Sequence, residues 1–104
     1  MSDKINKLSD AIRIGAKAGH QMRHILMDSS LNSCAIGAAF IAIGTNPSDI
    51  PDWAKLNEKF KIQGMIRHPI KKLLMTINRV VVSLNNDYEW SRERIADWLE
   101  SEGR

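Results

Sequence analysis

The residue best suited to covalent chemistry is the single cysteine, Cys34, in the apolar stretch "SCAIGAAFIAIG" that spans Ser33–Gly44. A nucleophilic thiol needs an accessible, electropositive setting and a base beside it. The residues that follow, Ala35 and Ile36, supply neither. A free cysteine among apolar residues behaves as a small hydrophobe. We therefore expect Cys34 to be a buried structural thiol, with a reactive thiol as the alternative.

Two histidines, His20 and His24, are four residues apart, which would place both on one face of a helix as half of a metal site. The residues between them lack the glutamate of a metalloprotease motif, and Arg23 would repel a cation. A third ligand would have to come from the distant His68. We predict no metal site and no cofactor.

The same histidines continue a polar stripe that begins at Arg13 and Lys17, with the spacing of one helix face. Such a stripe could contact phosphates. Two glycines in this stretch weaken a continuous helix, so a solvated face is the preferred interpretation and a binding face is the alternative.

The charge of the chain is unevenly distributed, and its centre is the better candidate for a binding surface. Residues 55–80 carry seven basic residues against Glu58 alone, whereas residues 81–104 carry three basic and six acidic residues. A one-signed cluster of this kind can bind phosphates or an acidic partner, although it can also be only a solvated face. The candidate partner- or phosphate-binding residues are Lys55, Lys59, Arg67, Lys71, Lys72 and Arg79.

Catalysis finds little support in the sequence. The carboxylates gather near the C-terminal end beside Arg92 and Arg94, where dispersed ion pairs explain them better than an acid–base pair. No spacing indicates a serine or cysteine nucleophile with its base. We predict that the chain is not an enzyme.

The elements that position these residues are predicted to be helices in one domain, residues 1–104. Ser33 is expected to cap a central helix, residues 33–43, that is apolar on every side and therefore buried. This stretch is too short to span a membrane, which needs about 20 apolar residues. For this reason we expect no membrane partner. One cysteine excludes a disulfide framework, so we also expect a cytoplasmic protein.

Further helices are expected around this core. Ser9 would cap a helix through Ile14, and a short helix would hold Met22, Ile25 and Leu26. Asp52 would cap a third, and a long helix would start at Ile70, with a strand as the alternative at 80–82. Ser91 would cap the last helix. Trp90 would pack against this helix as a hydrophobic staple. Alternatively, Trp90 and Tyr88 would be exposed as an anchor pair for a partner. The predicted fold class is all-α, a compact single domain of five or six short helices.

Three segments resemble a family of small, uncharacterised bacterial and phage proteins. They read "LSDAIRIGA" at Leu8–Ala16, "SCAIGAA" at Ser33–Ala39, and "LNND" from Leu84 followed by "WSRERIADWLE" from Trp90. Some members carry a Cys-x-x-Cys knuckle, which this chain lacks. The resemblance implies a phage or mobile-element setting and no particular reaction.

We accordingly predict a small accessory protein of phage or mobile-element type that binds a host protein or protein complex. Inhibition of a host defence system is one form that this binding could take. The alternative is a regulatory protein that binds nucleic acid directly through residues 55–80. The sequence does not indicate an oligomeric state.

Overall fold

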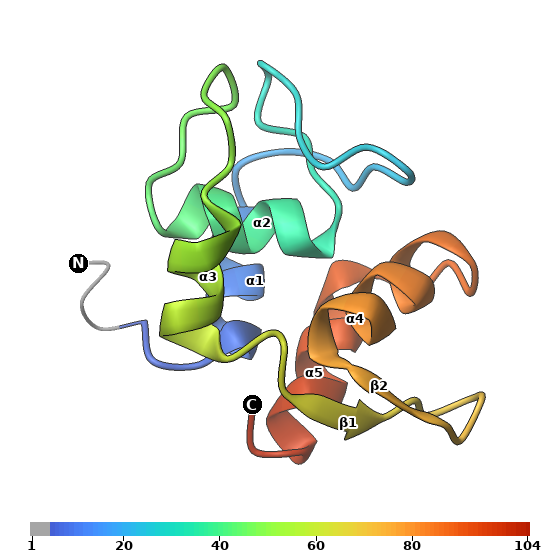
Figure 1. Ribbon diagram of the computed structural model, residues 1–104. Helices are drawn as coiled ribbons and strands as arrows, with labels where there is room; N and C mark the ends of the chain where they lie inside the picture. The colour runs from blue at the N-terminus through green and yellow to red at the C-terminus, as the bar shows by residue number, and fades with distance from the viewer. Residues whose placement is uncertain (1–4) are drawn as a thin grey trace.

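The computed structural model describes residues 5–104, which form five helices and one two-stranded antiparallel sheet (Figure 1). The helices are α1 (Leu8–Ala16), α2 (Ala35–Ala42), α3 (Trp53–Phe60), α4 (Ile77–Asn86) and α5 (Arg92–Ser101). The strands are β1 (Met65–Arg67) and β2 (Leu74–Thr76), paired so that Ile66 faces Met75. The compact single domain is thus mostly helical, and the strict all-α prediction is wrong because of this hairpin.

The centre of the domain is α2, as its composition predicts. Its first six residues, 35–40, are buried, and α1 packs directly against it. This approach depends on Gly15, where an added Cβ would lie 1.7 Å from the carbonyl oxygen of Ala38. Cys34 rather than Ser33 caps the helix, since its Sγ accepts the Gly37 N–H at 3.4 Å. No helix within residues 5–104 is long and apolar enough to cross a membrane.

The predicted caps of α3 and α5 are confirmed. Asp52 Oδ1 accepts the Lys55 N–H, and Ser91 Oγ accepts the Arg94 N–H, each at 3.0 Å. The Ser9 cap is wrong, because α1 begins before it, at Leu8, and Ser9 Oγ donates to the Arg104 carbonyl oxygen instead. Trp53 is partly exposed, with its ring edge-on to Phe40 at 5.0 Å.

The predicted short helix around Met22 is an irregular loop, residues 17–34. Its backbone groups bond across the loop rather than along a helix: Met22 N–H donates to the Ser33 carbonyl oxygen and Cys34 N–H to that of Leu26. Gly19 permits this folding, because an added Cβ there would lie 2.4 Å from the Leu31 carbonyl oxygen. Tertiary hydrogen bonds therefore override the local helical spacing.

The predicted long helix from Ile70 is also wrong in its first half. Residues up to Thr76 form the β1–β2 hairpin, and α4 begins at Ile77, capped by the Thr76 hydroxyl. Pro69 disfavours helix at the preceding residue, and Lys72 has a left-handed backbone, φ 63°. The run Val80–Val82 is helical, with two of its three side chains in the core.

Candidate functional site

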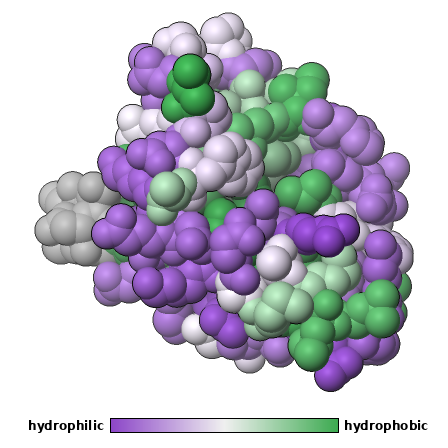
Figure 2. Space-filling view, in the orientation of Figure 1, coloured by the Kyte–Doolittle hydropathy of each residue, from purple (hydrophilic) through white to green (hydrophobic). Residues whose placement is uncertain are grey.

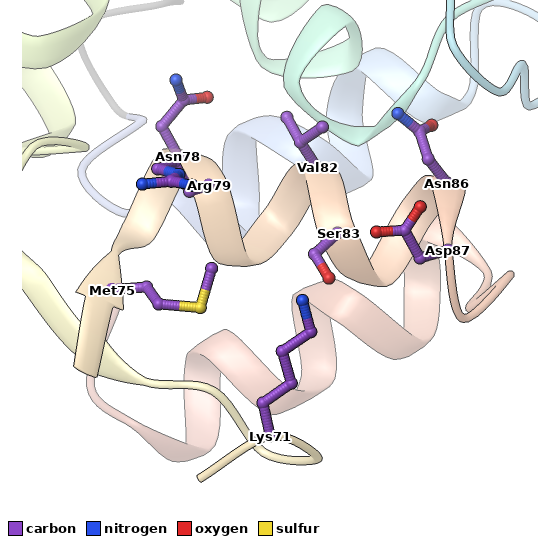
Figure 3. Close-up of a pocket in the computed structure, with 8 residues that line it drawn as sticks. All are labelled: Lys71, Met75, Asn78, Arg79, Val82, Ser83, Asn86 and Asp87. Carbon is purple, nitrogen blue, oxygen red and sulfur yellow. The ribbon is translucent and has the colours of Figure 1, made fainter. Parts of the chain in front are cut away.

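The hairpin and the outer face of α4 enclose a groove of about 360 Å³. Figure 3 shows Lys71 extending from the hairpin turn toward α4, with Arg79 and Met75 at one end of the groove and Asp87 at the other. The groove is lined by Lys71, Met75, Asn78, Arg79, Val82, Ser83, Asn86 and Asp87. It is thus bordered by two cations, one carboxylate and several neutral hydrogen-bonding groups.

His68, which is fully buried, fixes the hairpin turn beside this groove. Its Nδ1 accepts the backbone N–H groups of Ile70 and Lys71, each at 3.0 Å, and its Nε2 lies 3.1 Å from Ser83 Oγ. Because Nδ1 is occupied as an acceptor, the neutral ring carries its proton on Nε2 and donates it to Ser83. Burial, and then the charge of Lys71, lowers the pKa of His68, against a smaller opposite effect of Asp87.

This tautomer decides what the Ser83–His68 pair can do. A general base for a serine nucleophile must present an unprotonated nitrogen to the hydroxyl. In this structure the nitrogen that faces Ser83 carries the proton, and Nδ1 is blocked by two backbone donors. The pair therefore holds the hairpin on α4 and does not activate Ser83.

The outer surface of the hairpin combines exposed apolar side chains with cations. Met65, Ile70, Leu73 and Leu74 are 47–60% exposed. Arg67, Lys71 and Lys72 are exposed among them. These seven residues are called the hairpin surface below. Figure 2 shows its apolar part as a green area at the lower right, over β1 and β2.

The six basic residues singled out from the sequence are all exposed, but the structure divides them between elements. Lys55 and Lys59 lie on α3, whereas Arg67, Lys71, Lys72 and Arg79 belong to the hairpin and the start of α4. No carboxylate of residues 5–104 lies within 4.0 Å of any of the six. The hairpin group is therefore a cationic surface without internal neutralisation.

The other polar stripe does not form a binding face. Arg13 pairs with Asp97 at 2.8 Å and with Glu100 at 2.6 Å, which ties α1 to α5. His20 and His24 lie in the loop rather than on a helix, so their spacing does not place them on one face. Within the described part of the chain, no three histidine, cysteine or acidic side chains gather as a metal site would require.

Cys34 is buried, 8% exposed, at the start of α2. Burial raises the pKa of its thiol, and this effect exceeds the lowering by the Gly37 N–H bond and the charge of Arg92. A thiol in this setting is largely protonated at neutral pH, which favours the structural interpretation.

Sequence reasoning missed Arg92, which is 5% exposed at the start of α5. Its two terminal nitrogens donate to the carbonyl oxygens of Ala16, Gly19, His20 and Ser33 and to the Ser33 hydroxyl, at 2.7–3.3 Å. The guanidinium thereby ties the start of α5 to the end of α1 and to the residues just before α2. An arginine at a helix start gives no sequence signal for this role.

Asn85 is a second anchor of the loop 17–34 that the sequence did not reveal. Its Oδ1 accepts from Gln21 and from the Ala35 N–H, and its Nδ2 donates to the Met22 carbonyl oxygen. It is buried in the last turn of α4. Together with Arg92 it holds the loop 17–34 against α4 and α5.

Trp90 is half-buried against the core, as the staple interpretation requires, and its carbonyl oxygen accepts from Gln21. The guanidinium of Arg94 lies over its ring, 3.9 Å from the centroid. Tyr88 contacts the buried His68 ring, with centroids 5.4 Å apart. Both aromatic residues are thus engaged within the domain, which disfavours their use as a free anchor pair.

Comparison with known proteins gives no relative from which a role could be transferred. No protein-family model, no curated protein and no solved structure matches this chain.

Proposed function

We propose that this chain is a small accessory protein that acts by binding, and that it docks on a partner protein through the hairpin surface. The single observation that carries the proposal is the exposure of four large apolar side chains among three cations on one short hairpin. Contiguous exposed apolar groups rimmed by polar residues typically mark interaction sites. Three of the six basic residues proposed from the sequence, Arg67, Lys71 and Lys72, belong to this same surface.

The chemistry of the surface indicates what the partner presents. Leu73 and Leu74 would fill an apolar hollow, while Arg67, Lys71 and Lys72 would face carboxylates around its rim. Residues 59–86 contain no acidic side chain, so nothing within this stretch repels such a partner. Opposite charges across an interface speed association and exclude other partners, and buried apolar anchors supply most of the affinity.

Two parts of the proposal rest on the resemblance of the three sequence segments to phage and bacterial proteins. They are the choice of a host protein as the partner and the inhibition of a host defence system as one outcome. Those segments form the scaffold of α1, α2 and α5. The hairpin lies outside them, so members of such a family could share the scaffold and differ in the partner that the hairpin contacts.

Direct nucleic-acid binding is the second candidate, and it is favoured by one feature, the unneutralised cations of the hairpin and of α4. Phosphate contacts make binding fall steeply and linearly with salt on a logarithmic plot. Docking through Leu73 and Leu74 would depend on salt much less. A salt titration of the captured complex therefore separates the two candidates.

The test uses two variants with the same change in charge. The intact protein is immobilised, exposed to host lysate with and without nuclease treatment, and compared with Lys71→Glu/Lys72→Glu and Lys55→Glu/Lys59→Glu. We expect the hairpin variant to lose the protein that the wild type captures and the α3 variant to keep it. Equal loss from both variants, or loss of all partners on nuclease treatment, would overturn the docking proposal.

A second pair of variants tests the apolar part of the surface. Leu73→Ser/Leu74→Ser removes two exposed leucines, and Ile50→Ser removes an apolar side chain that is 94% exposed in another loop. We expect only the leucine variant to lose the partner. Retention of the partner by the leucine variant would leave charge alone as the basis of binding and contradict protein docking through this hairpin.

A further inference from the structure

We propose that the groove between the hairpin and α4 binds the phosphoryl group of a small phosphomonoester, held by Lys71, Arg79 and the Ser83 hydroxyl. This site goes beyond the docking function, although it shares Lys71 with the hairpin surface. The groove is recessed beside α4, whereas Leu73, Leu74 and Met65 are exposed on the hairpin outside its lining.

Two cations border the groove from different elements. Lys71 extends from the hairpin turn toward α4, and Arg79 lies in the first turn of α4 (Figure 3). Neither has a carboxylate within 4.0 Å among residues 5–104, so neither is held in an ion pair by that part of the chain. An ammonium and a guanidinium together offer the donors that a dianionic phosphoryl group accepts.

Ser83 adds a neutral donor whose direction is set by its neighbour. Because His68 donates its Nε2 proton to Ser83 Oγ, the hydroxyl hydrogen itself must point elsewhere. Ser83 makes no other side-chain hydrogen bond within the described residues, and it lines the groove. Its hydroxyl is therefore available to donate to a ligand oxygen.

The same histidine holds the backbone from which Lys71 extends. The Lys71 N–H donates to His68 Nδ1 at 3.0 Å, and the Lys72 N–H donates to the His68 carbonyl oxygen at 2.9 Å. These bonds fix the hairpin turn before any ligand arrives. The backbone at Lys71 therefore does not have to be ordered on binding, which lowers the entropic cost of forming the site.

The rest of the groove selects the class of ligand. Asp87 at the far end would repel a second anionic group, which disfavours a chain of phosphates such as a nucleic-acid backbone. Met75 and Val82 supply apolar wall to an organic group. The volume of about 360 Å³ is at the small end of the range of about 300–1,000 Å³ that is usual for small-molecule sites. The ligand that fits is one phosphoryl group on a compact organic body.

The test is a titration of the intact, isotope-labelled protein, followed through its backbone amide NMR signals at constant ionic strength. The probes are inorganic phosphate, adenosine monophosphate, and a short oligonucleotide without a terminal phosphate. We expect saturable shifts at the amides of Lys71, Arg79 and Ser83, with the monophosphate bound more tightly than inorganic phosphate and the oligonucleotide weakest.

Matched variants make the result specific. Ser83→Ala should weaken binding by at least about three- to tenfold, because it removes one hydrogen bond to the ligand and also the acceptor of the buried His68 Nε2 proton. Arg79→Gln, which changes an exposed side chain, should weaken it by about tenfold through the loss of a charge-assisted bond, while Lys55→Gln should leave it unchanged. Absence of saturable shifts, equal shifts around the α3 lysines, or tightest binding of the oligonucleotide would each overturn the proposal.

Discussion

Replacement of Arg92 by methionine tests the central structural feature, the buried guanidinium that joins α5 to the loop 17–34. Methionine keeps a long, flexible side chain and removes the donors. The His20 and Ser33 carbonyl oxygens would keep the partners Ser33 N–H and Met22 N–H, each at 2.9 Å. The carbonyl oxygens of Ala16 and Gly19 have no other hydrogen-bond donor among the described residues, so they would lose theirs.

The expected size of the effect follows from these two carbonyl groups. Each buried acceptor left without a partner costs about 1–3 kcal/mol, so about 2–6 kcal/mol is the upper limit for the two together, since Gly19 is only half-buried. Relief from burying a charged guanidinium offsets part of this, so we expect a loss of about 3 kcal/mol in the free energy of unfolding. A domain of this size has about 5–15 kcal/mol in total. The melting temperature should fall by about 12–24 °C.

The assay is thermal and urea unfolding followed by circular dichroism, with Arg94→Met as the matched control. Arg94 is exposed on the same helix and lies only over the Trp90 ring, a contact worth about 0.5–1 kcal/mol. Amide exchange should rise first within the loop 17–34 of the Arg92 variant. Equal stabilities of the two variants, or unchanged exchange in the loop, would refute the anchoring role.

The remaining predictions concern His68, Gly15 and Cys34. Burial favours the neutral form of His68 in the folded state. The stability that this preference contributes should be present above about pH 6.5 and be lost as pH falls from there through the lowered pKa of His68. Urea unfolding across this range should show this loss of stability, which His68→Leu should flatten and His24→Asn should leave unchanged. Gly15→Ala should destabilise the domain by about 1–3 kcal/mol or more, because its Cβ would meet the Ala38 carbonyl group, as thermal unfolding would show. Cys34 should react with iodoacetamide far more slowly in the native protein than in urea, and equal rates would contradict its burial.

The sequence predicts the parts of the fold that depend on local chemistry. The central helix follows from an apolar stretch with no polar face, and the caps at Asp52 and Ser91 follow from side chains that can accept the first free N–H groups of a helix. These features need no information from distant residues.

The wrong secondary-structure predictions concern segments whose conformation is set by hydrogen bonds from other parts of the fold. The sequence predicted a long helix from Ile70, but the buried His68 binds the backbone N–H groups of Ile70 and Lys71 and forces a turn there. The loop 17–34 is likewise held by Arg92 and Asn85, about 60–70 residues away in the sequence. Local periodicity carries no signal for such contacts.

For the candidate site, the sequence shows that residues 55–80 are basic, but it does not show how the fold divides these residues between the hairpin, α4 and α3. Lys71 and Arg79 border one groove because the hairpin folds onto α4, whereas Lys55 and Lys59 belong to α3. The contribution of Ser83 depends on the tautomer of His68, which only the three-dimensional hydrogen bonds reveal.

The most direct test of the docking surface is site-specific photocrosslinking in host lysate. A photoreactive amino acid is placed at Leu73 in one sample of the intact protein and at Ile50 in another, both of which are exposed positions. If the partner docks on the hairpin surface, position 73 should give one discrete protein adduct, lost in Lys71→Glu/Lys72→Glu and insensitive to nuclease, and position 50 should give none. The same adduct from position 50, or no adduct from position 73 while the protein captures its partner, would contradict docking on this surface.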